Sequence, residues 1–298
     1  MPNSSITIVG APISLGAGKR GVDLGPSALR YADIGERLSA LGHPVHDLGN
    51  IPVTSPPELG SYPKLRYLTT ISLFCATVAD HVAAAVAAGR IPLILGGDHS
   101  LSIGSVAGSA RGRDIGLIWI DAHGDFNTAG ISPSGNIHGM SLACLTGQGH
   151  PDLTGFAGRV PAINPAYVAL VGVRDLDPGE RQALRASGVR CFTMQDIDRR
   201  GFSAVMEDAI TIVSQAPDGF HVSFDLDVID PREAPGVGTP VPGGISYREA
   251  HLAMEFIAVS GRMVSIDLVE DNPVLDDRNA TALLGVELIQ SAFGKQIL

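Results

Sequence analysis

The sequence predicts an α/β protein built around a parallel sheet. Short β-branched runs recur along the 298 residues and helix-like stretches separate them, an alternation typical of strand–helix units. Several of these runs are apolar throughout instead of alternating, as is usual for strands covered on both faces. The 36 glycines and 20 prolines are scattered, which indicates many turns between short elements.

Eight runs are expected to be the strands, because turn residues bound each of them. In chain order they are Ile6–Val9, Pro44–His46, Pro92–Leu95, Gly116–Ile120, Val168–Val171, Val189–Thr193, His221–Phe224 and Met263–Ile266.

Four helices are predicted from their composition and their ends. The first has proline in its first turn, the second is rich in alanine and stops at Gly89, and the third opens with the capping-box pair Ser246 and Glu249. Together with a helix that closes the chain, they span Pro26–Leu41, Ala76–Ala88, Ser246–Val259 and Arg278–Ala292.

No linker, repeat or low-complexity segment interrupts the alternation, so residues 1–298 are expected to form a single domain. Eight strand–helix pairs suit an open sheet with helices on both faces, and they also suit a TIM barrel. Hydrophobic periodicity does not separate these two architectures.

Composition excludes several classes of partner. The net charge of −10 and the absence of a basic stripe argue against binding to nucleic acid or to an anionic membrane. Apolar runs are broken short of a membrane span, and the first apolar run has no basic segment before it, so it is interpreted as a strand and not as a signal peptide. The three cysteines (Cys75, Cys144 and Cys191) show no paired spacing, which favours a reducing cytoplasm.

Three clusters of acids and imidazoles follow predicted strands. They are GGDHS at 96–100, DAHGD at 121–125 and the pair Asp225 and Asp227. Side chains at i, i+2 and i+4 of an extended chain point to one side, so the members of each cluster can converge. The carboxyl ends of parallel strands are also where α/β sheets bind ligands.

The clusters together indicate a binuclear metal site. Each alone is weak, because acids are common at strand ends and Asp98 or Ser100 suits a helix N-cap. Four aspartates balance the charge of two divalent ions, and an oxygen-rich set without thiolate favours Mn²⁺ over structural zinc. Two such ions can share a nucleophilic hydroxide. The expected ligands are His99, Asp121, His123, Asp125, Asp225 and Asp227. The remaining histidines, apart from His138, are expected at the surface or hydrogen-bonded in the core.

Longer motifs extend this set over nearly the whole chain. The segments GGDHS, DAHGDFNT, SPSGNIHGM, VGVRDLDPGE, SFDLDVIDP, GVGTPVPGGISYRE and VEDNPVLD stand in an order that resembles the ureohydrolase family, with bacterial arginases the nearest members. The start, GAPISLGAGKRGVDLGPSALR, is similar as well. This resemblance implies a single catalytic domain with an open eight-stranded parallel sheet, and it decides against a barrel.

The resemblance also implies the roles of individual residues. The six ligands would hold two Mn²⁺ per chain, with Asp125 also accepting a hydrogen bond from the bridging hydroxide. His138 would carry protons and Glu270 would hold the guanidinium group of the substrate. The implied substrate contacts are Asn127, Ser132 and Ser134 for the α-carboxylate, Asp177 with Glu180 behind it for the α-ammonium, and Thr239 beside the guanidinium.

The implied reaction is hydrolysis of L-arginine to L-ornithine and urea by a cytoplasmic homo-oligomer, a trimer or a hexamer. The alternatives are an agmatinase or guanidino-acid hydrolase, an amide hydrolase of the related deacetylase type, and an inactive binding or regulatory protein. Two positions depart from the family pattern: Asp271 replaces the usual valine after Glu270, and Val228 replaces a frequent glycine.

Overall fold

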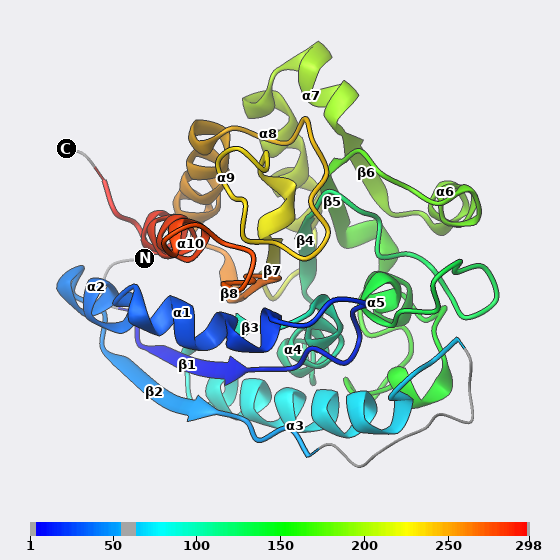
Figure 1. Ribbon diagram of the computed structural model, residues 1–298, viewed down its shortest axis with the longest axis horizontal. Coiled ribbons are helices and arrows are strands. Elements are labelled where there is room, and N and C mark those ends of the chain that lie inside the picture. The colour runs from blue at the N-terminus through cyan, green and yellow to red at the C-terminus, as the bar shows by residue number, and fades with distance from the viewer. Residues whose placement is uncertain (1–3, 55–63, 297–298) are drawn as a thin grey trace.

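One eight-stranded sheet runs through the computed structural model, which describes residues 4–54 and 64–296 (Figure 1). All the strand pairings are parallel, in the order β2-β1-β3-β8-β7-β4-β5-β6. The strands are β1 (Ile6–Ala11), β2 (Val45–Asn50), β3 (Ile91–Gly96), β4 (Gly116–Ile120), β5 (Val168–Val173), β6 (Arg190–Thr193), β7 (Phe220–Asp225) and β8 (Met263–Val269).

Each predicted strand is confirmed, and the sheet is open, with β2 and β6 at its edges. The buried central strands are apolar along their length; all five residues of β4, for example, are buried. This follows from helices covering both faces of the sheet. The predicted domain, residues 1–298, includes positions outside the described residues, so its boundaries stay a prediction.

Helices form a layer on each face of the sheet (Figure 1). One core lies between the strands and the layer that contains α1, α2 and α8 to α10; two smaller cores lie on the opposite face, under α3 to α6. The described helices are α1 (Gly25–Tyr31), α2 (Ile34–Ala40), α3 (Leu68–Ala87), α4 (Ser102–Ser109), α5 (Ser141–Leu145), α6 (Pro178–Ser187), α7 (Met194–Arg200), α8 (Phe202–Val213), α9 (Tyr247–Ser260) and α10 (Ala280–Ala292).

The prediction of one helix over residues 26–41 is wrong. The chain breaks between α1 and α2, where Asp33 adopts a left-handed backbone with φ 63°. The start of the last helix also shifts, from Arg278 to Ala280, because Arg278 and Asn279 have positive φ. By contrast, the capping box of Ser246 and Glu249 at the start of α9 is confirmed.

Helix α4 was not predicted, because its sequence SIGSVAGS is poor in strong helix formers. Its glycines serve close packing: a Cβ on Gly104 would lie 2.3 Å from the carbonyl oxygen of Cys75, and one on Gly108 would lie 2.5 Å from that of Ala79. Tight contact with α3 therefore holds α4 in a helix that its local propensity does not favour.

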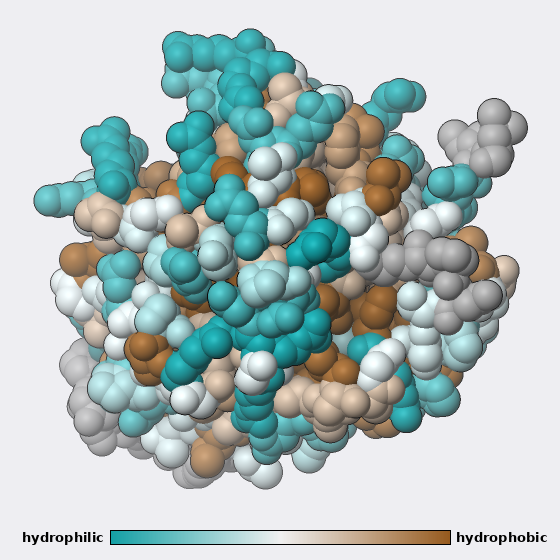
Figure 2. Space-filling model, turned by 180° about the vertical axis from the view of Figure 1, so that it is seen from behind, coloured by the Kyte–Doolittle hydropathy of each residue, from teal (hydrophilic) through white to brown (hydrophobic). Residues whose placement is uncertain are grey.

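Helix α3 is longer than predicted, because it begins at Leu68 and not at Ala76. Its 20 residues meet the length and hydropathy of a membrane span, but core helices of soluble proteins meet the same test. Ile71, Cys75 and Val78 of α3 are fully buried in one of the cores. On the face seen in Figure 2, hydrophobic residues are interspersed with hydrophilic ones and form no continuous band.

Candidate active site

The loops that follow β3, β4, β7 and β8 meet at the carboxyl edge of the sheet and bring the predicted ligands together. The Nδ1 atom of His99 lies 3.1 Å from Oδ2 of Asp121, 3.2 Å from Oδ2 of Asp125 and 3.0 Å from Oδ2 of Asp225. All four residues are buried. This group would hold one cation.

A second group lies beside the first and shares Asp121 with it. His123 Nδ1 is 3.0 Å from Oδ2 of Asp227 and 3.5 Å from Oδ1 of Asp121. Within each trio, His99–Asp121–Asp225 and Asp121–His123–Asp227, one ligand atom per residue lies within 4.8 Å of the others. Asp125 belongs to neither trio, although it contacts His99.

The donor set fits two divalent cations. His99 Nδ1 and Asp125 Oδ2 are buried and have no hydrogen-bond partner among the described residues, although three carboxylate oxygens lie 3.0–3.2 Å from His99 Nδ1. Burial, followed by the charge of neighbouring aspartates, raises the pKa of Asp125 and Asp225. Closely spaced buried acids of this kind are stabilised when cations neutralise them.

The ligands of the second cluster, at 121–125, were expected to converge by alternation along an extended chain. The structure does not show this arrangement. Beyond β4 the chain bends at residues 122 and 123, and Asp125 has a left-handed φ of 48°. Its carbonyl oxygen accepts hydrogen bonds from the backbone of Leu142 and Ala143 in α5 (2.9 and 3.2 Å). Helix α5 therefore fixes the turn that directs Asp125 toward His99.

Three residues behind the ligands were not predicted. Trp119 donates from Nε1 to Oδ2 of Asp121 (2.9 Å), and its ring stacks on His99 with centroids 4.1 Å apart. Ser223 lies 2.8 Å from Nε2 of His99 and donates to Asp267 (2.6 Å). Because the Ser223 hydroxyl proton goes to Asp267, its oxygen accepts from Nε2, which leaves Nδ1 of His99 unprotonated for a cation.

Histidines outside the site are hydrogen-bonded in the core where they are buried. His43 lies 3.0 Å from the carbonyl oxygens of Ser4 and Phe293 through its two ring nitrogens. His221 pairs with Ser265 (2.6 Å) and Asp267 (2.9 Å). The prediction of structural roles for these two is confirmed.

His138 and Glu270 meet beside the metal cluster. Oε1 of Glu270 lies 3.1 Å from Nδ1 of His138 and accepts from the backbone N–H of His99 (3.0 Å). Burial disfavours the imidazolium, but the hydrogen bond to Glu270 together with the negative charges of Glu270, Asp125 and Asp98 outweighs it and raises the pKa of His138 to about 9. Oε2 of Glu270 has no hydrogen bond to any described residue, and Glu270 is buried and does not itself line the cavity described below. Glu270 also has a left-handed φ of 65°.

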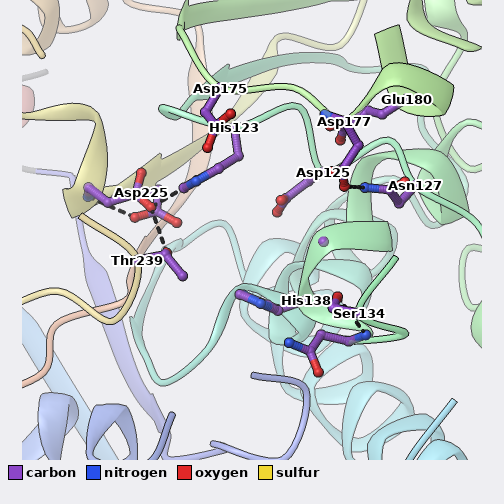
Figure 3. Close-up of a pocket in the computed structure, with 13 residues that line it drawn as sticks. His123, Asp125, Asn127, Ser134, His138, Asp175, Asp177, Glu180, Asp225 and Thr239 are labelled. Carbon is purple, nitrogen blue, oxygen red and sulfur yellow. Dashed lines mark hydrogen bonds and ion pairs between the residues drawn. The ribbon is translucent and has the colours of Figure 1, made fainter. Parts of the chain in front are cut away.

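A cavity of about 260 Å³ opens onto this cluster (Figure 3). Figure 3 shows His123, Asp225 and Thr239 toward one end and Asn127, Asp177 and Glu180 toward the other, with Asp125 between them. Thr239 donates to Oδ2 of Asp227 (3.0 Å). A small molecule in the cavity can therefore contact the expected metal ligands at one end and Asn127 and Asp177 at the other at the same time.

The substrate residues implied by the resemblance take different positions. Asn127, Ser134, Asp177, Glu180 and Thr239 line the cavity, and so do Asp175 and Asn136, which were not predicted. Ser132 does not line the cavity; it is buried and accepts from the backbone of Gly135 (2.9 Å). It therefore supports the loop that carries Ser134. A signal for Asn136 was present in SPSGNIHGM, two residues from His138.

Glu180 holds Asp177 in place. Its two carboxylate oxygens accept from the backbone of Phe126 (2.8 Å) and of Asp177 (3.2 Å), which completes a capping box at the start of α6. Asp177 and Glu180 therefore also cap helix α6. Asn127 donates to Oδ2 of Asp177 (3.0 Å), which links the loop after β4 to the start of α6 at this end of the cavity.

Asp271, the departure next to Glu270, is fully buried, and neither of its oxygens has a hydrogen-bond partner among the described residues. Burial and the charge of Asp276 raise the pKa of Asp271 to about 8. Its backbone pairs with Val237. The other departure, Val228, is buried against Gly172, which has no side chain: a Cβ there would lie 2.4 Å from Val228 Cγ2.

Asp271→Val is expected to raise the free energy of unfolding by about 2 kcal/mol at neutral pH, because it removes an unpaired buried polar group from an extended segment that suits valine. The folded state keeps the proton that the unfolded state loses above its ordinary pKa. The destabilisation by Asp271 therefore grows as pH rises from about 4 to 8. Thermal unfolding of both proteins at pH 5 and pH 8 measures this, and the gain should be larger at pH 8.

The matched control is Asp277→Val, since the side chain of Asp277 is 84% exposed and its replacement should change stability little. An equal gain at the two pH values would contradict ionisation of Asp271 as the cause.

Comparison with known proteins supports the relationship that the motifs suggested. The model of the arginase family matches residues 4–294. The arginase of Bacillus caldovelox is 49% identical over 98% of this chain and 99% of its own length, and that of Bacillus subtilis is 47% identical over 99% and 100%. The solved structure of the B. caldovelox enzyme superimposes with a TM-score of 0.96 at 48% identity, covering 99% of this chain and 100% of its own. With this fold, these motifs and matches of this extent, the chain belongs to the arginase family.

Proposed function

We propose that this protein hydrolyses the guanidinium group of L-arginine to give L-ornithine and urea, with two Mn²⁺ bound per chain. The observation that carries the proposal is one cavity that joins a two-cation cluster to groups suited to an amino acid's ends. The similar proteins named arginase, among them an Entamoeba histolytica enzyme solved with L-ornithine at 32% identity, support the same substrate.

Mn²⁺ is proposed from the chemistry of the donors. Two imidazoles and four carboxylates, with no thiolate, form a hard and strongly anionic set that suits Mn²⁺ better than structural zinc. When bound, the two ions supply a hydroxide that is nucleophilic near neutral pH and stabilise developing negative charge.

The residues of the chain orient the substrate and move the proton. Oε2 of Glu270 accepts from the guanidinium group, while its Oε1 stays bonded to His138 and the backbone of His99. The departing amine needs a proton, which Asp125 delivers and His138 replaces. Asn127 and Ser134 face the α-carboxylate, and Asp177, held by Glu180, faces the α-ammonium. Fixed groups of this kind lower the cost of reaching the reactive geometry.

The alternatives are weaker for stated reasons. An agmatinase would share the metal cluster but has no use for a wall that binds an α-carboxylate and an α-ammonium. A deacetylase-type site needs one cation, so one of the two trios of possible ligands would have no role. An inactive relative should lack a ligand, whereas this chain has an acid or an imidazole at all six expected positions.

The direct test is release of urea and ornithine by Mn²⁺-loaded protein from L-arginine, with agmatine and guanidinobutyrate assayed in parallel. Urea from arginine alone supports the proposal. Two further properties stay predictions from the resemblance: assembly into a homo-oligomer, a trimer or a hexamer, and a cytoplasmic location. Light scattering of the purified protein measures the number of chains in the oligomer.

His138→Asn is expected to lower kcat by about 10²–10⁴-fold, the usual loss when a proton-transfer group is removed. Both cations should stay bound, because His138 pairs with Glu270 and not with the six ligands. Steady-state rates together with metal content measure both effects. His46→Asn, at an exposed histidine, is the control. An unchanged kcat at neutral pH would show that His138 is only structural.

A further inference from the structure

We propose that Arg66 is a positioning residue that sets preference for a substrate bearing an α-carboxylate. It does so by fixing the side-chain amide of Asn136 with its NH₂ group available to the cavity. This inference rests on the proposed function, because it concerns the carboxylate end of the same substrate.

The central observation is a single hydrogen bond. Nη2 of Arg66 donates to Oδ1 of Asn136 at 2.8 Å, and Asn136 lines the cavity beside Ser134. The amide nitrogen of Asn136 donates to no described residue. It lies beside Gly18, where a Cβ would approach Nδ2 to 3.2 Å, so the missing side chain at Gly18 leaves this nitrogen room.

The segment that carries Arg66 is attached to the loop that carries Asn136. Nζ of Lys64 donates to the carbonyl oxygen of Ser132 (3.2 Å). Gly135 has a φ of +71°, and a Cβ on it would lie only 2.6 Å from the Cα of Lys64. The two backbones therefore pack directly on each other, which keeps the backbone of Arg66 close to the loop of Asn136, while the Arg66 side chain is exposed.

The physical reason for such a contact lies in the symmetry of the amide. The oxygen and nitrogen of asparagine are nearly the same size, so the group fits its site in either of two orientations. With the nitrogen toward the cavity it donates to a carboxylate, whereas with the oxygen inward it repels one. A guanidinium donates only, so Arg66 selects the oxygen as its neighbour and leaves the nitrogen for the substrate.

Arg66 thus acts at a distance from the reacting carbon. Its loss should weaken binding of the carboxylate in the ground state and in the transition state equally, which raises KM and leaves kcat unchanged. Agmatine has no carboxylate, so its kinetics should not respond. This pattern separates positioning of Asn136 from a general structural role, which would affect both substrates.

The experiment is a double-mutant cycle on the Mn²⁺-loaded enzyme with Arg66→Ala, Asn136→Ala and the double variant, each assayed with L-arginine and agmatine. Arg66→Ala should raise KM for arginine about tenfold, the equivalent of one hydrogen bond of about 1.4 kcal/mol. Its kcat should stay within about twofold. The double variant should be no worse than Asn136→Ala alone, because Arg66 works through that amide.

Two controls complete the design. Arg66→Lys keeps the charge and one donor, and should recover part of the loss. Arg232→Ala removes an arginine whose side chain is 92% exposed, and it should leave both substrates unaffected.

Three results would overturn the inference: an unchanged KM for arginine in Arg66→Ala, an equal loss with agmatine, or effects of the two substitutions that multiply in the double variant. The last would mean that Arg66 acts through its own charge. A wild type that releases no urea from arginine would instead refute the proposed function, and this inference with it.

Discussion

L-Arginine is expected to exceed agmatine by about 10⁴-fold in kcat/KM. A site built to hydrogen-bond a substrate group rejects analogues that lack it by about this factor, because its own buried polar groups are then left unpaired. Asn127 and Asp177 supply such groups: both residues line the cavity, and Nδ2 of Asn127 has a second N–H besides the one it donates to Asp177. Agmatine lacks the carboxylate, and guanidinobutyrate lacks the ammonium.

Asp177→Ala should erode this preference mainly through a lower kcat/KM for arginine, with metal content unchanged. Asp80→Ala, at an exposed aspartate paired with Arg111, is the matched control and should leave the ratio intact. If the wild type cleaves agmatine or guanidinobutyrate as well as arginine, the arginase assignment fails while a binuclear hydrolase remains. Asp271, next to Glu270, would then be the first position to restore to valine.

Removal of the cations is expected to abolish activity, and Mn²⁺ should restore it. Asp227→Ala should lower Mn²⁺ affinity by more than about 100-fold, since even loss of a residue behind a metal ligand costs about 10–100-fold. Asp227 contacts His123 at 3.0 Å and accepts from Thr239, so its loss opens the second trio. Metal analysis and the rise in melting temperature on Mn²⁺ addition measure binding independently of turnover.

The wild type should bind two Mn²⁺ per chain and Asp227→Ala fewer, with Asp80→Ala again as control. Full activity with stoichiometric zinc, or no bound metal after Mn²⁺ loading, would contradict the predicted cofactor.

The sequence predicted well those features that depend on residues close to one another along the chain. β-Branched runs predicted the strands, and clusters such as DAHGD predicted which acids and imidazoles gather at the carboxyl edge of the sheet, because neighbours along the chain remain neighbours in space. Trp119 precedes Asp121, and Ser223 precedes Asp225, by two residues at the carboxyl end of a strand, so strand periodicity could have identified both.

Other features depend on which segments pack together. Asp267 supports His99 only because β8 lies between β3 and β7, an order that no local pattern reveals. Arg66 and Asn136 are 70 residues apart and meet through a loop contact. The break between α1 and α2 was missed because Asp33, at the break, is neither glycine nor proline.

The left-handed backbone of Asp125 and Glu270 bears on how this enzyme would respond to laboratory selection. Glycine occupies that conformation at lower cost than these acids do, so each site holds local strain. A screen for heat resistance alone would favour replacement of both acids and would enrich inert proteins. Selection for thermostable variants of this enzyme should therefore score urea production in the same round, and it should leave positions 125 and 270 out of the mutated library.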